Sequence, residues 1–104
     1  MNALTLVHNA IKAYVGEGGV CIDATAGRGY DTAFLCELVG KDGLVTAFDV
    51  QQDAIDSTRR LLDDKSLSAR LVLDSHANMS KYFEDESVDC IVFNLGYLPK
   101  GDHS

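Results

Sequence analysis

The chain has 104 residues, of which 46% are hydrophobic and 24% charged, and its formal net charge is −7. This length and composition are typical of one small globular domain and exclude a disordered chain. The acidic balance argues against a protein that holds nucleic acid through net positive charge, because Lys and Arg normally supply the phosphate contacts. The sequence shows no signal peptide and no apolar stretch that could span a bilayer, so we expect a cytoplasmic protein.

The apolar pattern alternates helices and strands along the whole chain. In chain order we expect a helix at 3–15, a strand at 20–24, a helix at 31–39 capped by Gly40, a strand at 44–48, a helix at 52–63, a strand at 69–73, a short helix at 75–81 and a strand at 88–93. The strands are almost wholly apolar, which is typical of a parallel sheet covered by helices. We therefore expect a single α/β domain over residues 1–104, Rossmann-like, with the strand order 3-2-1-4.

In that order the fourth strand is an edge, although its residues Cys90, Ile91, Val92 and Phe93 are apolar. An exposed apolar edge strand is an aggregation hazard. The sequence also stops soon after this strand. We therefore expect either that the chain is the N-terminal part of a longer domain with further strands, or that a partner covers the edge.

Residues 20–31, VCIDATAGRGYD, form the most informative segment. A strand that stops at Asp23, a loop with Gly27 and Gly29, and a helix start bring backbone N–H groups against a nucleotide-like ligand. Asp49 lies twenty residues past Gly29, where this architecture places a carboxylate for ribose hydroxyls. Together these features predict a site for a nucleoside cofactor.

Two cofactor templates fit the loop unequally. Dinucleotide folds use G-x-G-x-x-G, and here Thr32 stands at the position of the third glycine. S-adenosylmethionine enzymes prefer an acidic residue at the end of the first strand and then glycines two residues apart. Asp23, Gly27 and Gly29 match that pattern, with Thr25 in place of one glycine. We therefore expect S-adenosyl-L-methionine as the cofactor, with an NAD-binding oxidoreductase as the alternative.

Polar residues also follow the other strands, and ligands bind at the carboxyl ends of parallel strands. Gln51 is expected to flank the adenine, and Asp74 to accept a hydrogen bond from the adenine amino group, with His76 beside it. The competing interpretation is structural, because Asp at a strand end is often a helix cap or turn former. His76 is more often a surface or capping residue than a catalyst.

The reacting end of the site is expected in Asn94-Leu95-Gly96-Tyr97, which has the spacing of the Asn-Pro-Pro-Tyr loop of many amine methyltransferases. There the Asn oxygen orients the target amine and the aromatic ring stacks on the base. Asn94 and Tyr97 are therefore the predicted catalytic residues. The alternative is an ordinary turn with Tyr97 as a packing residue.

Three segments, 23–32, 47–51 and 93–102, together resemble the small bacterial YtqB-like putative rRNA methylase family. The resemblance implies a class I S-adenosylmethionine-dependent methyltransferase that N-methylates the 5-aminomethyl group of the tRNA wobble uridine. It implies cofactor contacts at Asp23, Gly27, Gly29, Asp49 and Gln51, and substrate-side residues at Asn94, Tyr97 and Asp102. Family members are nearly twice as long, so the chain resembles their N-terminal half.

Three other interpretations stay open at this point. The substrate could be rRNA instead of tRNA, the chain could bind NAD, or it could be a non-catalytic module that acts through the edge of its fourth strand, for example as a homodimer. Cys21, Cys36 and Cys90 lack the spacing of a metal site and are expected to be buried free thiols.

Overall fold

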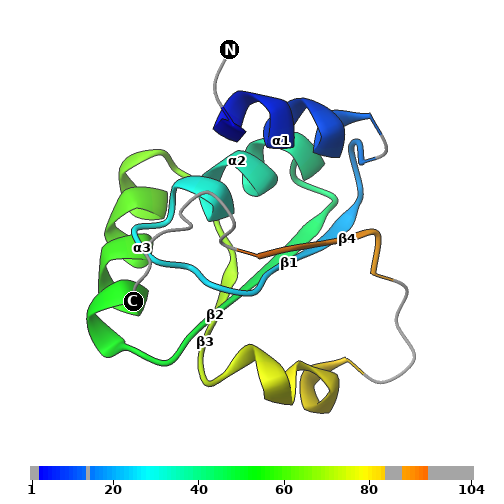
Figure 1. Ribbon diagram of the computed structural model, residues 1–104. Helices are drawn as coiled ribbons and strands as arrows, with labels where there is room; N and C mark the ends of the chain where they lie inside the picture. Colours follow the sequence, from blue (N-terminus) through cyan, green and yellow to red (C-terminus); the bar gives the residue numbers. More distant parts are fainter. Residues whose placement is uncertain (1–2, 14, 84–87, 94–104) are drawn as a thin grey trace.

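The fold is built on a four-stranded parallel sheet, seen in a computed structural model that describes residues 3–13, 15–83 and 88–93 (Figure 1). The strand order is β3-β2-β1-β4, which confirms the predicted 3-2-1-4 arrangement. The elements in chain order are α1 (Ala3–Lys12), β1 (Val20–Asp23), α2 (Tyr30–Val39), β2 (Leu44–Asp49), α3 (Gln52–Asp64), β3 (Arg70–Leu73), the 3₁₀ helix η1 (His76–Tyr82) and β4 (Cys90–Val92). Each predicted element is present.

The register brings the ends of the strands to one edge of the sheet. Asp23 pairs with Ala47 on β2 and with Val92 on β4, and Asp49 pairs with Leu73 on β3. All four strands run in the same direction, so the residues that follow them lie along the same carboxyl edge. This edge is where the predicted cofactor residues gather.

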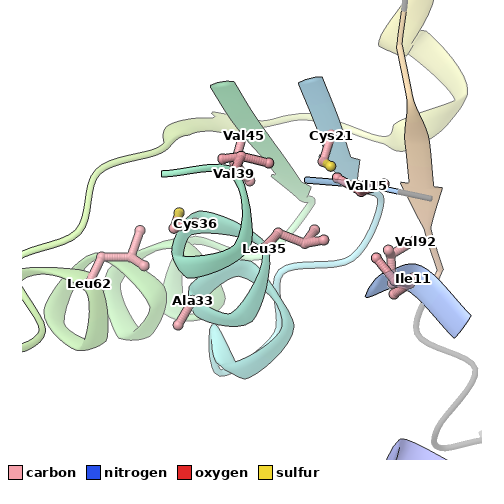
Figure 2. Packing of buried hydrophobic residues seen from close by; sticks show 10 residues of the cluster. All are labelled: Ile11, Val15, Cys21, Ala33, Leu35, Cys36, Val39, Val45, Leu62 and Val92. Carbon is pink, nitrogen blue, oxygen red and sulfur yellow. The ribbon is translucent and has the colours of Figure 1, made fainter. Parts of the chain in front are cut away.

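The hydrophobic core lies between the α-helices and one face of the sheet (Figures 1 and 2). Its buried residues are Ile11, Val15, Cys21, Ala33, Leu35, Cys36, Val39, Val45, Leu62 and Val92. Helical spacing places Phe34, Leu35, Leu38 and Val39 on one apolar face of α2, but Phe34 and Leu38 are only partly buried. The buried stripe shifts because α2 contacts the sheet and α3 along the side that carries Thr32, Ala33 and Cys36.

Helix α1 covers the outer side of α2 through an aromatic contact. The His8 ring stacks on the Phe34 ring with centroids 3.8 Å apart and planes 4° apart, and His8 Nε2 lies 3.0 Å from Asp31 Oδ1. Helix α1 ends at Lys12 instead of the predicted residue 15, and Val15 N–H still donates to the Ile11 carbonyl. These contacts explain why Phe34 is part of a helix–helix contact and not of the sheet core.

Among the described residues, the opposite face of the sheet is contacted by the 3₁₀ helix η1. Side chains alternate between faces along a strand, so Phe48 lies on the face opposite Val45. There the η1 residue Tyr82 packs edge-on against Phe48, with ring centroids 5.4 Å apart. On the edge strand, however, Ile91 is 42% exposed and Phe93 43%. The expectation of an apolar edge at the fourth strand is confirmed, and so is that of a parallel sheet with helices packed on it.

The cysteines follow the same division between core and edge. Cys21 and Cys36 are buried free thiols, and their burial raises the pKa of each to about 11. Cys90 is also free but only half-buried, which corrects the expectation of burial, because β4 has a neighbouring strand on one side only. In the described ranges no group of His, Cys, Asp and Glu could hold a metal ion. Nor does any helix in this part of the chain have the length and apolarity to cross a membrane.

Candidate functional site

The loop that leaves β1 needs glycine at two positions, for two different reasons. Gly27 and Gly29 both adopt left-handed backbone conformations, with φ of 57° and 94°. A Cβ on Gly27 would meet nothing within 4 Å, so the backbone conformation alone favours glycine there. A Cβ on Gly29 would lie 2.9 Å from Thr58 Cα, so glycine also allows the close approach of the loop to α3.

Backbone hydrogen bonds hold this loop against β2 and α3. Ala26 N–H donates to the Phe48 carbonyl at 2.8 Å, and Gly29 N–H donates to the Ala26 carbonyl at 2.8 Å. From α3, the Thr58 hydroxyl donates to the Gly27 carbonyl at 3.3 Å. The loop is thus fixed by β2 and α3, whereas α2 is the element that starts directly after it in the chain.

Asp49 joins the glycine loop to the start of α3. Its Oδ2 accepts a hydrogen bond from Gly27 N–H at 3.0 Å, and its Oδ1 accepts one from Gln51 N–H at 3.0 Å. Each carboxylate oxygen can accept a further hydrogen bond, and the side chain is only half-buried. The carboxylate can therefore accept hydrogen bonds from a bound hydroxyl group while it holds the loop. Gln51, the N-cap residue of α3, has an exposed side chain beside it.

Asp23 lies deeper than the other predicted site residues. It is fully buried, with Oδ2 accepting from the Thr32 hydroxyl at 2.7 Å and Oδ1 from Thr25 N–H at 3.1 Å. Burial raises the pKa of Asp23 to about 7, against the lowering effect of these two hydrogen bonds. The nearby carboxylates of Asp31 and Asp49 also contribute to the raised value. Such enclosure favours an electrostatic and loop-shaping role over a direct contact with a ligand.

Asp74 organises the segment after β3. Its Oδ1 accepts from Ser75 N–H at 2.7 Å and Asn78 Nδ2 at 2.9 Å, and its Oδ2 accepts from the Tyr82 hydroxyl at 2.8 Å. The hydrogen bonds from Asn78, Tyr82 and Ser75 lower the pKa of Asp74. The side chain thus has the structural function that the sequence allowed as an alternative, and its role toward adenine stays a prediction.

The structure describes His76 but not the predicted catalytic residues. The His76 ring packs edge-on against Phe93, with centroids 5.4 Å apart, and so links η1 to the end of β4. The sequence favoured a surface or capping residue here, and the predicted contact of His76 with the cofactor stays a prediction. Asn94, Tyr97 and Asp102 lie outside the described residues.

Two features of this edge were missed by sequence reasoning. Thr32 was noted only as a mismatch to a dinucleotide template, and the structure shows it bonded to Asp23. Val50 and Leu73, next to Asp49 and Asp74, are 67% and 52% exposed. An apolar residue directly beside a strand-terminal carboxylate was the available signal, because a nucleoside site needs apolar contacts for the base as well as polar ones.

Comparison with known proteins gives the following matches. The sequence model of the family described as "Putative rRNA methylase" matches residues 45–104. The chloroplastic tRNA (mnm(5)s(2)U34)-methyltransferase of Arabidopsis thaliana is 36% identical over 98% of this chain and 41% of its own length. The ribosomal RNA small subunit methyltransferase H of Halothermothrix orenii is 36% identical over 77% of this chain and 26% of its own length.

Solved structures agree with the fold. The crystal structure of a putative rRNA-methylase from Clostridium thermocellum has a TM-score of 0.88 at 49% identity, covering 100% of this chain and 56% of that one. A putative methyltransferase from Streptococcus mutans in complex with SAH has a TM-score of 0.82 at 36% identity, with 98% and 56% covered. The chain thus spans about half the length of these structures. Its fold is the Rossmann-like fold of class I S-adenosylmethionine-dependent methyltransferases, as the sequence predicted.

Proposed function

This chain belongs to the putative rRNA methylase family, and we propose that it forms the cofactor-binding part of an S-adenosylmethionine-dependent RNA N-methyltransferase. The observation that carries the proposal is the hydrogen bond between Gly27 N–H and Asp49 Oδ2. It joins the two features from which the nucleoside site was predicted, the glycine loop and the carboxylate that ends the second strand.

The residues at this edge fit an adenosyl group. Asp49 keeps acceptor capacity for ribose hydroxyls beyond its two backbone contacts. Val50 supplies an exposed apolar surface for one face of the adenine, and Gln51 lies beside it. Asp74 Oδ2 accepts one hydrogen bond, so it retains capacity for the adenine amino group, with His76 near by in sequence. Bound S-adenosylmethionine supplies an electrophilic methyl group on a sulfonium.

The part of this chain in the transfer step is to position the acceptor. We assign Asn94 to accept hydrogen bonds from the target amine and Tyr97 to stack on the base that carries it. An in-line displacement needs the amine lone pair to face the methyl carbon, and it gains most of its acceleration from such positioning. The nitrogen gains the methyl group and releases one proton.

For the substrate we propose the aminomethyl group of the tRNA wobble uridine. The support is the relative described as a tRNA (mnm(5)s(2)U34)-methyltransferase, which matches 98% of this chain. A second candidate substrate is rRNA, which the family description and the matching ribosomal RNA methyltransferases favour. Mass spectrometry of modified nucleosides from tRNA and rRNA of cells that lack the intact protein separates the two. Loss of methylated wobble nucleosides supports tRNA, and loss confined to rRNA overturns that assignment.

Calorimetric titration with S-adenosylhomocysteine tests the cofactor site. We expect saturable binding that weakens about tenfold or more in Asp49→Asn, because the substitution removes the charge from the ribose acceptor. Asp64→Asn, at the exposed end of α3, is the matched control and should bind like the wild type. Heat with NAD and none with S-adenosylhomocysteine would contradict the proposal and favour an oxidoreductase.

A further inference from the structure

The junction of β1 and α2 contains a buried polar pair that the proposed function does not use. Thr32, in the first turn of α2, and Asp23, the last residue of β1, are both fully buried. Their contact closes the turn in which the glycine loop lies. We propose that Thr32 is a positioning residue of the cofactor site, whose hydroxyl fixes the Asp23 carboxyl beneath the loop and favours its ionised form. This inference rests on the proposed function, because it concerns the same site.

The geometry of the pair is that of a charge-assisted hydrogen bond. The Thr32 hydroxyl donates to Asp23 Oδ2 at 2.7 Å, a length typical of a hydroxyl bonded to a carboxylate. The other oxygen, Oδ1, accepts from Thr25 N–H at 3.1 Å, within the loop itself. The carboxyl therefore connects the helix start to the loop backbone, and rotation of either oxygen would break one of the two contacts.

The residue type at position 32 follows from this arrangement. The dinucleotide template has glycine here, which lets the helix approach the strand closely. In this chain Thr32 is fully buried, so the junction of strand and helix has room for a side chain larger than that of glycine. Valine has nearly the same shape without the hydroxyl, and it would leave a buried carboxylate oxygen without its donor.

The groups around Asp23 have opposing effects on its pKa, so that loss of one hydrogen bond changes its protonation state near neutral pH. Asp31 and Cys36 on α2 and Asp49 on β2 are the titratable groups that face it. Burial and the two carboxylates raise the pKa of Asp23 and the bonds from Thr32 and Thr25 lower it, and the net result is a pKa of about 7. Without the Thr32 hydroxyl the neutral acid would predominate at neutral pH, because that bond is the largest of the lowering effects.

The consequence is a specific pH dependence of ligand binding. S-adenosylmethionine carries a sulfonium and an α-ammonium group, and S-adenosylhomocysteine carries the α-ammonium group. Both cations favour an ionised carboxyl beneath the loop. Affinity should therefore rise with pH through the titration of Asp23 and reach a plateau above it. Loss of the Thr32 hydroxyl should move the rise in affinity to higher pH and leave the affinity at the plateau nearly unchanged.

Calorimetric titration of the intact protein with S-adenosylhomocysteine between pH 6 and pH 9 tests this. For Thr32→Val we expect affinity about fivefold lower at pH 7, recovery toward the wild-type value at pH 9, and a midpoint about one unit higher. Thr32→Ser, which keeps the hydroxyl, should retain the wild-type profile. A Thr32→Val loss that is equal at every pH would overturn the inference, because it would mark a packing role.

A second measurement covers the case in which Thr32→Val does not fold. Carbon-13 NMR of labelled aspartate follows the Asp23 carboxyl in the wild type, in Thr32→Ser and in Thr32→Ala, with Asp23→Asn to assign the resonance. A midpoint that lies higher in Thr32→Ala than in the wild type and in Thr32→Ser supports the inference, and the same midpoint in all three proteins overturns it. Absence of ligand binding by the wild type at every pH would instead overturn the proposed function, so the two failures are distinguishable.

Discussion

Replacement of Gly29 by alanine should be among the most destabilising single changes in the loop. The left-handed backbone, with φ of 94°, costs an L-residue about 1–2 kcal/mol. The new Cβ would also lie 2.9 Å from Thr58 Cα, 3.1 Å from its hydroxyl oxygen and 3.2 Å from its Cβ. Overpacking against backbone typically costs about 1–3 kcal/mol. The free energy of unfolding should fall by about 2–5 kcal/mol, a large part of the total stability of a small domain.

Two other glycines separate the conformational cost from the steric one. Gly27→Ala meets open space but has φ of 57°, so it should cost only about 1–2 kcal/mol. Gly16→Ala has open space and no left-handed backbone, so it should change stability by less than about 1 kcal/mol in either direction. Urea denaturation of the three variants, followed by circular dichroism, gives the unfolding free energies. If Gly29→Ala is no more destabilising than Gly27→Ala, the close approach of the loop to α3 is not real.

Two further predictions concern buried polar groups. Burial raises the pKa of Asp23 from 3.8 to about 7, so the folded protein holds this proton more tightly than the unfolded chain. The unfolding free energy of the wild type relative to Asp23→Asn should therefore fall by up to about 4 kcal/mol between pH 4 and pH 7 and stay level at higher pH. Urea denaturation at a series of pH values measures this difference. A difference that does not change with pH would refute the raised pKa of Asp23. Thr46 is fully buried, and its hydroxyl has no partner among the described residues. Thr46→Val should stabilise the protein by about 1 kcal/mol and so raise the midpoint of thermal unfolding. Thr58→Val removes a hydrogen-bond donor from the Gly27 carbonyl and should lower that midpoint. Equal losses in both variants would contradict this.

The sheet order and the main contact of the site were predictable because they depend on local patterns. Apolar strand segments that alternate with helical segments predict a parallel sheet. The spacing from Gly29 to Asp49 predicts that the Asp49 carboxylate lies beside the glycine loop. The hydrogen bond from Gly27 to Asp49 is the structural counterpart of that spacing.

What the sequence could not predict depends on how the chain turns back on itself and on where each strand lies in the sheet. Whether Asp74 is available to a ligand depends on Asn78 and Tyr82, whose side chains reach it only because η1 turns back over the sheet. The partial exposure of Cys90 depends on its place at the edge of the sheet and not on the apolar strand around it. Thr32 looked like a defect in one template because its partner Asp23 is brought to it by the fold.

The two backbone contacts of Asp49 mean that the proposed ribose acceptor is in place before any ligand arrives. A preorganised acceptor spares the incoming molecule the entropy of ordering a loop, so association should resemble simple docking and show little dependence on conformational rearrangement.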